Sequence, residues 1–256
     1  MNKVKKAAFS FIAVGLLLIA AGVGLSLLLP LTPLNDTVSS KTLYFSDVRE
    51  LIVITGTLSV RVEPTDGDIC EVSYLSDLPV VANTDELGTL RLTQDDDFSL
   101  TFFSARRRDF HLTVKLPARS YERISLSSSS GSIACGAIPC GSLELSTRSG
   151  SIAVDGADQR LKLRTESGAV DLRLTDLSDD MTVAAGTGDI RLAAAEGLSY
   201  CLVFLTEDGG RLFEEGESPS LGDKAIFRAG AKNRLTVTTT GGDLYFSEFT
   251  AEEREG

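Results

Sequence analysis

The stretch ISLSSSSGSIACGAIPCGSLELSTRSGSIAV, residues 124–154, carries the strongest fold signal in this chain. It contains two copies of one pattern, centred on Gly131 and Gly150. In each copy the positions seven and five residues before the glycine, and two and four residues after it, are apolar. Apolar residues that alternate with polar ones are typical of a half-buried β-strand. Each copy therefore predicts two short strands joined by a turn at the glycine.

The same pattern recurs through residues 120–246. The apolar positions are Ile124, Leu126, Ile133 and Cys135 around Gly131; Leu143, Leu145, Ile152 and Val154 around Gly150; Leu161, Leu163, Val170 and Leu172 around Gly168; Met181, Val183, Ile190 and Leu192 around Gly188; and Leu235, Val237, Leu244 and Phe246 around Gly242. A sixth copy around Gly209 has Arg211 at an apolar position, which indicates a slip beside Gly210. The first four glycines are 19, 18 and 20 residues apart, a period typical of stacked repeats.

A small hydroxyl residue precedes the glycine in the first four copies, which favours a turn. Serine and threonine side chains bond to the backbone in turns, and glycine allows a positive φ. We therefore predict that six glycines form the repeat turns: Gly131, Gly150, Gly168, Gly188, Gly209 and Gly242. Two architectures fit this pattern. One is a meander of β-hairpins, and the other is a solenoid in which each repeat is one rung stacked on the last.

Residues that share a phase in consecutive repeats favour the solenoid. Three pairs carry opposite charges: Glu144 and Lys162, Arg148 and Glu166, Asp171 and Arg191. Ser128, Thr147 and Thr165 form a comparable row of hydroxyl groups. Strands stacked in register place equivalent residues about 4.8 Å apart, whereas a meander places them about 10 Å apart. We predict an all-β fold, a β-helix-like solenoid with two short strands in each rung of ~19 residues.

Residues 43–117 contain less regular strand patterns. Gly56, with Leu51, Leu58 and Val60, resembles a degraded copy that has Arg49 at an apolar position. The predicted solenoid domain therefore spans 48–247. Within it, 48–117 form divergent rungs and 120–246 form regular repeats. Residues 30–47 read as a polar linker before it, and 248–256 read as a polar tail after it.

One segment of the divergent region, Gln94 to Asp109, reads as an insertion between rungs. Insertions on solenoids often carry binding sites. This one holds the basic cluster Arg106, Arg107 and Arg108, which makes it a candidate binding insertion. The alternative is a solvated loop tip whose charge is neutralised by the nearby aspartates 95–97.

The amino terminus contains the uncharged run Ala7 to Leu29, preceded by Lys3, Lys5 and Lys6. As a helix this run is about 35 Å long, enough to cross a hydrocarbon core of about 30 Å. Lysines on the short side favour a cytoplasmic amino terminus, residues 1–6. We predict a single-pass helix at 7–29 in a bacterial cytoplasmic membrane, with the repeat domain extracytoplasmic. A cleaved signal peptide is the alternative.

Charge and cysteine content exclude several classes of partner and site. From residue 31 onward there are 22 basic residues (25 minus 3) and 36 acidic ones, a net charge of −14, which repels nucleic acid. Cys135 occupies a core phase and is expected to be a small buried hydrophobic residue. Cys135 and Cys140 are close enough in sequence to bridge across a turn. The cysteine spacing and the single histidine do not match a zinc site.

The sequence provides no recognisable catalytic set. His111 is the only histidine, the usual base for a nucleophile. Asp155, Asp171 and Asp189 lie on successive repeats, but at different phases. They therefore do not form one row of paired carboxylates, which a glycosidase needs about 5 to 9.5 Å apart. The glycines near Asp189 and Asp243 lack the spacing of calcium-binding repeats. We predict no catalytic, cofactor or metal site.

The repeats resemble the bacterial putative-adhesin β-strand-repeat family, domain of unknown function family 4097. The motifs that carry the resemblance are Ser130-Gly131-Ser132-Ile133, Ser149-Gly150-Ser151-Ile152, Ser167-Gly168-Ala169-Val170 and Thr187-Gly188-Asp189-Ile190. The resemblance covers mainly 120–246 and implies a β-helix-like envelope protein, of a family that is sometimes associated with envelope stress. It implies no catalytic residues.

These observations lead to a functional hypothesis with two alternatives. The chain is expected to be a membrane-anchored, non-enzymatic binding or scaffold module of the bacterial envelope. Its expected partner is a cell-wall component or a membrane protein. The first alternative is a regulator in an envelope-stress signalling system, acting through its helix or its extracytoplasmic domain. The second is a β-helix enzyme acting on carbohydrate, which would use carboxylates from neighbouring rungs.

Overall fold

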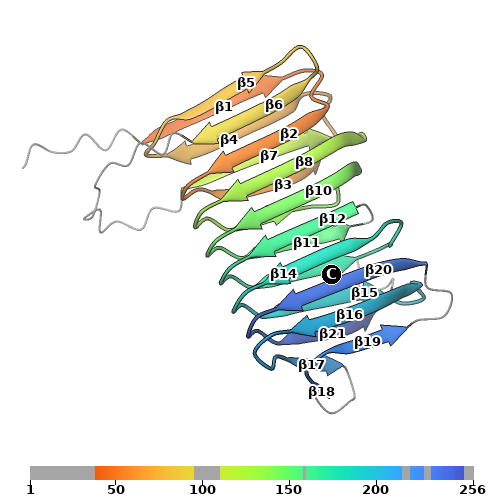
Figure 1. Ribbon diagram of the computed structural model, residues 1–256. Coiled ribbons are helices and arrows are strands. Elements are labelled where there is room, and N and C mark those ends of the chain that lie inside the picture. The colour runs from red at the N-terminus through yellow and green to blue at the C-terminus, as the bar shows by residue number, and fades with distance from the viewer. Residues whose placement is uncertain (1–37, 95–109, 158–159, 215–219, 228–231, 251–256) are drawn as a thin grey trace, which may run out of the picture. The chain divides into compact units, whose positions relative to one another are not determined.

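Two long β-sheets make up the described part of the chain, residues 38–94, 110–157, 160–214, 220–227 and 232–250 of a computed structural model (Figure 1). The strands are β1 (Ser39–Phe45), β2 (Glu50–Thr55), β3 (Ser59–Thr65), β4 (Cys70–Ser76), β5 (Val80–Thr84), β6 (Thr89–Gln94), β7 (His111–Pro117), β8 (Tyr121–Ser128), β9 (Ile133–Cys135), β10 (Cys140–Thr147), β11 (Ile152–Ala157), β12 (Arg160–Thr165), β13 (Val170–Leu174), β14 (Met181–Ala185), β15 (Ile190–Ala195), β16 (Tyr200–Thr206), β17 (Arg211–Glu214), β18 (Ser220–Leu221), β19 (Lys224–Phe227), β20 (Asn233–Thr239) and β21 (Leu244–Phe249).

Each rung of the stack contributes one strand to each sheet. The first sheet has the order β1-β4-β7-β3-β9-β11-β13-β15-β21-β17-β18, and the second has β19-β16-β20-β14-β12-β10-β8-β2-β6-β5. The repeat strands pair in parallel, with Glu144 opposite Lys162 and Asp171 opposite Arg191. Arg148 and Glu166 form an ion pair of 3.6 Å. The all-β, solenoid-like prediction is confirmed over the meander, because repeats pair with each other in parallel and in register.

The stacking order departs from the chain order at both ends. The rung β2/β3 lies directly against β8/β9, and β6/β7 lies outside it. At the other end β20/β21 lies between β14/β15 and β16/β17, although it comes last in the chain. The expectation that each repeat stacks on the previous one is therefore wrong at the ends. Both displaced rungs are connected through strands that reverse direction.

Antiparallel strands cover the two ends of the stack. At one end β1 and β4 lie beyond β7, and β5 lies beyond β6. At the other end β18 pairs with β17, and β19 pairs with β16. An open parallel edge would offer unpaired backbone groups and an uncovered core to other chains. The reversed strands satisfy the last parallel rung of each sheet.

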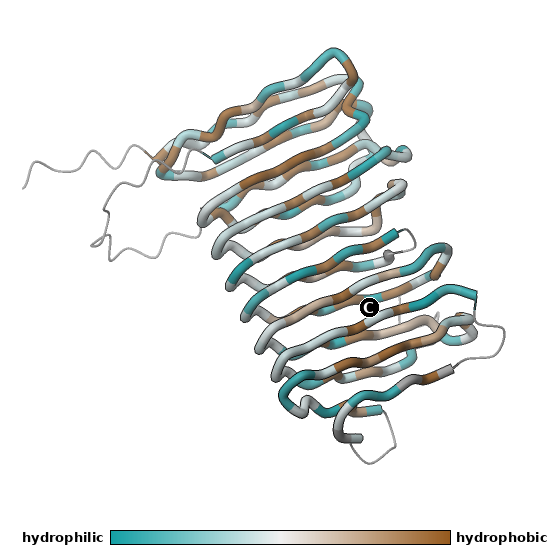
Figure 2. The backbone as a smooth tube through the Cα atoms, in the orientation of Figure 1, coloured by the Kyte–Doolittle hydropathy of each residue, from teal (hydrophilic) through white to brown (hydrophobic). Residues whose placement is uncertain are grey.

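The core lies between the two sheets and is built from the predicted apolar positions. Figure 2 shows apolar segments recurring in strand after strand. The apolar positions of the five regular copies are all buried. Cys135 is among them, as predicted, and burial raises the pKa of its thiol to about 12. All four cysteines are free, so Cys135 and Cys140 do not form a bridge.

The glycines lie at the corners between the sheets, but for a different reason from the one expected. Among the six, only Gly209 has a positive φ, +80°. The others stack so closely that a side chain would strike the backbone of the next rung. A Cβ on Gly168 would lie 1.8 Å from the carbonyl oxygen of Gly150, and one on Gly150 would lie 2.1 Å from that of Gly131. The corner requires close backbone approach rather than a left-handed conformation.

Register also corrects two of the repeat origins. Val60 pairs with Ile133, so the residue of the β2/β3 rung that corresponds to Gly131 is Leu58, not Gly56. Because the apolar period in a strand is two residues, an alignment shifted by two still matches most apolar positions. In the last copy Gly210 takes the stacked position, since its Cβ would lie 2.4 Å from the Gly242 carbonyl oxygen. Gly209 is an extra residue in that corner.

A row of buried hydroxyl groups supports the same corner. The Thr147 hydroxyl donates to the Gly131 carbonyl (3.2 Å) and accepts from the Gly150 N–H (3.1 Å). Thr165 repeats this arrangement one rung later. Gln94 occupies the row in the rung β6/β7, where its Oε1 accepts from the Gly56 N–H (2.9 Å). Ser128, Thr147 and Thr165 were predicted as a row, and the row is confirmed.

Ala185 interrupts this row, which provides a stabilising substitution. It lies between Thr165 and Thr239 in the register and is buried. Its methyl group can neither donate nor accept. Ala185→Thr is expected to raise the free energy of unfolding by about 0.5–1.5 kcal/mol, because the hydroxyl can bond to the Gly188 N–H and the Gly168 carbonyl. Urea unfolding of the full-length chain measures the change. Ala185→Val is the control, and an equal gain for valine would contradict the hydrogen-bond explanation.

Several predicted segments lie outside the described residues. These are the membrane helix at 7–29 with its cytoplasmic end 1–6, and most of the insertion, with Arg106, Arg107 and Arg108. In the part of the chain that the structure describes, no helix has the length and apolar character needed to cross a membrane. Strand β1 lies within the predicted linker 30–47, and β21 ends inside the predicted tail 248–256.

Candidate binding groove

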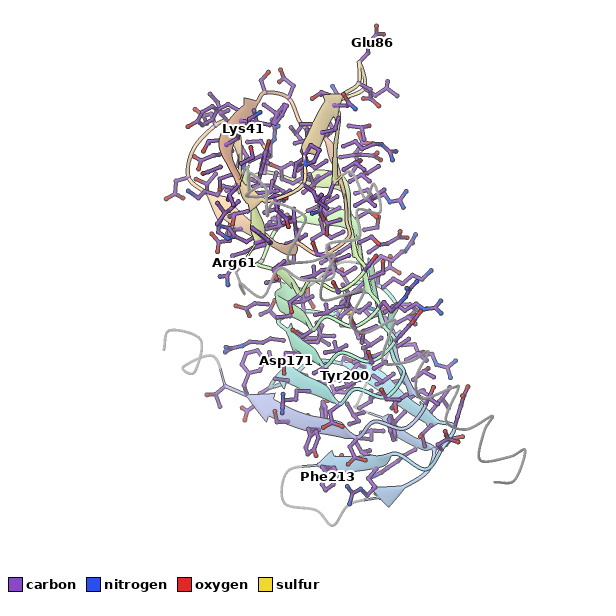
Figure 3. All side chains as sticks on the ribbon, turned by 90° about the vertical axis from the view of Figure 1, so that its left-hand side faces the viewer. Lys41, Arg61, Glu86, Asp171, Tyr200 and Phe213 are labelled. Carbon is purple, nitrogen blue, oxygen red and sulfur yellow. The ribbon has the colours of Figure 1, made fainter. Side chains whose placement is uncertain are left out.

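The outer face of the first sheet presents rows of side chains that run across the strands. In register, one row passes through Arg61 (β3), Ala134 (β9), Ala153 (β11), Asp171 (β13), Arg191 (β15), Tyr245 (β21) and Phe213 (β17). Figure 3 shows Arg61, Asp171 and Phe213 at successive levels along the molecule. Six strand spacings of about 4.8 Å separate the ends of the row, which gives a length of about 29 Å.

A groove of about 860 Å³ lies along this row, from β3 to β17. Its floor is low where Ala134, Gly136 and Ala153 stand on the central strands. Larger side chains rise at both ends, with Arg61 on β3 and the aromatic rings on β21 and β17. The hollow therefore arises from small side chains in the middle of a row of large ones. Its volume is within the range of ligand-binding clefts.

A pair of stacked aromatic rings closes one end of the groove. The rings of Phe213 and Tyr245 have centroids 4.8 Å apart and planes 8° apart. The guanidinium of Arg211 lies 5.0 Å from the Phe213 ring centroid, on the side of Phe213 away from β21. Tyr245 nonetheless keeps 38% of its surface exposed. The stack therefore provides a rigid, exposed aromatic surface beside the hollow.

Ion pairs hold the charged groups of this face in place. Arg191 contacts Asp171 at 3.5 Å, and Arg61 contacts Glu63 at 3.3 Å. Arg211 contacts Asp243 at 2.7 Å, and this hydrogen bond lowers the pKa of the Asp243 carboxyl. The groove lining contains three arginines, Arg61, Arg173 and Arg191, and four carboxylates, Glu63, Asp155, Asp171 and Glu214. Its charge is thus close to zero on a strongly acidic domain.

The aspartates considered for catalysis lie in three different rows of this face. Asp155 pairs with Arg173, Asp171 with Ala153 and Arg191, and Asp189 lies one row further, beside Asp243. The Asp189 carboxylate accepts from the Asp243 N–H (3.0 Å). His111 is exposed on β7, opposite Ser59 and Leu75. Among the described residues, no group of three or more histidine, cysteine or acidic side chains could hold a metal ion.

The groove residues were not among the candidate sites of the sequence. Tyr245 follows Gly242 by three, and Phe213 follows Gly210 by three, so both occupy the same outward phase. Aligning the last copy on Gly209 hides this match. Stacking order matters as well, because β17 lies beside β21 only after the chain order is broken. An alignment on Gly210 would have revealed the aromatic pair as a candidate surface.

Solved structures of other proteins share the fold. One is titled a putative cell adhesion protein from Clostridium sporogenes, with a TM-score of 0.52 at 13% identity; the match covers 82% of this chain and 100% of that one. Another is a putative adhesin from Parabacteroides merdae, with a TM-score of 0.36 at 13% identity, covering 84% of this chain and 97% of that one. At these identities the likeness shows the fold alone.

The curated proteins provide no match to this chain. A family model does match, over the region that contains both sheets and the groove. It is described as Toastrack DUF4097 and matches residues 48–247, which is more than half of the chain. The chain belongs to the Toastrack DUF4097 family.

Proposed function

We propose that this chain is a non-enzymatic binding module of the bacterial envelope, anchored by the helix predicted at 7–29. The observation that carries the proposal is the groove on the first sheet, with its exposed aromatic end. Every strand that lines it is bonded to neighbours on both sides. A surface supported in this way keeps its shape when a ligand binds, which lowers the ordering cost of association.

The placement of charged groups supports binding rather than catalysis. Asp171 is paired with Arg191, and Asp155 lies in another row, opposite Arg173. A glycosidase would place two carboxyl groups across one scissile bond, with one of them protonated as the acid. Here the carboxylates face guanidinium groups, which favour the ionised form. Such pairs suit recognition of a ligand by hydrogen bonds.

The adhesion role of the structural relatives comes to this chain only as part of the proposal. The relative from Clostridium sporogenes is titled a cell adhesion protein of putative status. We extend that role to binding of an envelope component outside the cytoplasmic membrane. A net charge of −14 beyond residue 30 disfavours nucleic acid and other polyanions as partners.

Sedimentation with isolated bacterial cell walls tests the proposed function. We expect the purified full-length chain to co-sediment saturably with the walls and to release no soluble sugar from them. An acidic protein of similar size is the control. Release of sugar that is lost in an Asp155→Asn, Asp171→Asn double variant would instead establish an enzyme. Crosslinking to a membrane protein, with no binding to walls, would favour the regulatory alternative.

A further inference from the structure

We infer that the groove on the first sheet binds an extended, uncharged glycan that lies across the strands, parallel to the stacking axis. This inference rests on the proposed binding function and adds the class of ligand and its orientation. The groove follows one row of residues for about 29 Å, from Arg61 to Phe213. A linear polymer placed along it meets a new side chain at every strand.

The backbone of the sheet argues against an extended peptide as the occupant. The seven strands that line the groove, β3, β9, β11, β13, β15, β21 and β17, each pair with a strand on both sides. No free edge exists within the groove where a peptide could add a strand by main-chain hydrogen bonds. The ligand must therefore be recognised by side chains alone, which is how polyhydroxylated chains are bound.

The charge of the groove indicates an uncharged ligand. Its three arginines and four carboxylates nearly cancel, whereas the domain as a whole is strongly acidic. A polyanion would be repelled by the surrounding field, and a polycation would find more attractive surface elsewhere. Paired groups such as Arg191 and Asp171 offer donors and acceptors side by side. Sugar hydroxyl groups, which both donate and accept, match that arrangement.

The aromatic end provides the apolar contact that a sugar ring requires. Tyr245 is packed against Phe213 on one face and remains partly exposed. The apolar face of a pyranose ring can cover an aromatic ring that is already held in position, so little side-chain freedom is lost. The low floor at Ala134 and Ala153 leaves room for the following sugars. The aromatic pair thus holds one end of the glycan while the floor accommodates the remainder.

Calorimetric titration of the full-length chain with oligosaccharides of N-acetylglucosamine tests this inference. We expect affinity to rise with chain length until the oligosaccharide fills the groove. Tyr245→Ala should weaken binding about tenfold or more, and Tyr245→Phe should retain it, because the ring face rather than the hydroxyl makes the contact. Tyr44→Ala is the matched control: Tyr44 is exposed on β1 of the same sheet and does not line the groove.

A second variant tests the floor independently of the aromatic pair. Ala153 is exposed between Ala134 and Asp171, so Ala153→Phe should fill the hollow and abolish binding without altering the core. Oligosaccharide binding that persists in both Tyr245→Ala and Ala153→Phe would overturn the inference. So would binding to cell walls with none to the oligosaccharides, in which case the proposed function survives. Loss of binding to both wild-type probes would overturn the proposed function as well.

Discussion

Replacement of Gly242 by alanine is expected to lower the free energy of unfolding by about 3 kcal/mol or more. A Cβ at this position would lie 2.1 Å from the carbonyl oxygen of Gly188 and 2.7 Å from its carbonyl carbon. Both atoms belong to the backbone of a neighbouring rung, so no side chain can rotate away. Relief requires the rungs β14/β15 and β20/β21 to separate, which would break parallel strand pairing along both sheets.

The adjacent glycine is the control for this substitution. A Cβ on Gly241 would have no atom within 4 Å, and Gly241 does not have a positive φ. Gly241→Ala is therefore expected to change stability by no more than about 0.5 kcal/mol. Urea unfolding of the full-length chain, followed by far-ultraviolet circular dichroism, measures both variants. Equal losses at the two positions would show that backbone freedom, rather than the stacking contact, makes the corner glycines necessary.

The second large effect is expected at Thr165. Its buried hydroxyl donates to the Gly150 carbonyl (3.3 Å) and accepts from the Gly168 N–H (3.0 Å), so it joins two successive corners. Thr165→Val keeps the shape of the side chain and removes both bonds. A buried backbone N–H that loses its acceptor costs about 1–3 kcal/mol. We expect a loss in that range, measured by the shift of the urea midpoint at constant slope.

An exposed threonine separates the effect of the hydroxyl from that of the strand. Thr182 on the neighbouring β14 points outward and is exposed. Thr182→Val is therefore expected to change stability by less than about 0.5 kcal/mol. If Thr165→Val were as mild as Thr182→Val, the hydroxyl row would be a consequence of the stacking and not a source of stability.

The regular repeats allowed a sequence-based prediction of the fold because each copy satisfies two requirements together. Leu143 and Leu145 alternate with polar residues, as a strand with one buried face demands, and Gly150 follows where the chain turns. Pairs such as Asp171 and Arg191 then distinguished stacking from a meander, since only adjacent strands bring such residues together. Local pattern and long-range register agreed, which is typical of sequences with one stable fold.

The divergent copies were harder because the apolar period of a strand is only two residues. Leu58 occupies the corner of its rung without a glycine, and nothing local separates it from an alignment centred on Gly56. Gly209 and Gly210 presented the same problem, since one extra residue shifts only the second strand of the copy. Both errors were resolved by the neighbouring rung, which pairs with one register and not the other.

The candidate groove depended even more on contacts between distant segments. Phe213 and Tyr245 come from rungs that the chain visits in the opposite order from their stacking, and Ala134 and Ala153 form a floor only between them. The sequence by itself determined the repeat, its two strands per rung and the buried positions, because these follow from local alternation and spacing. Only the tertiary structure decided the order of the end rungs, the contact that excludes a side chain at each corner and the position of the groove. Those features arise where strands far apart in the chain pair, and a local pattern does not encode which strands will meet.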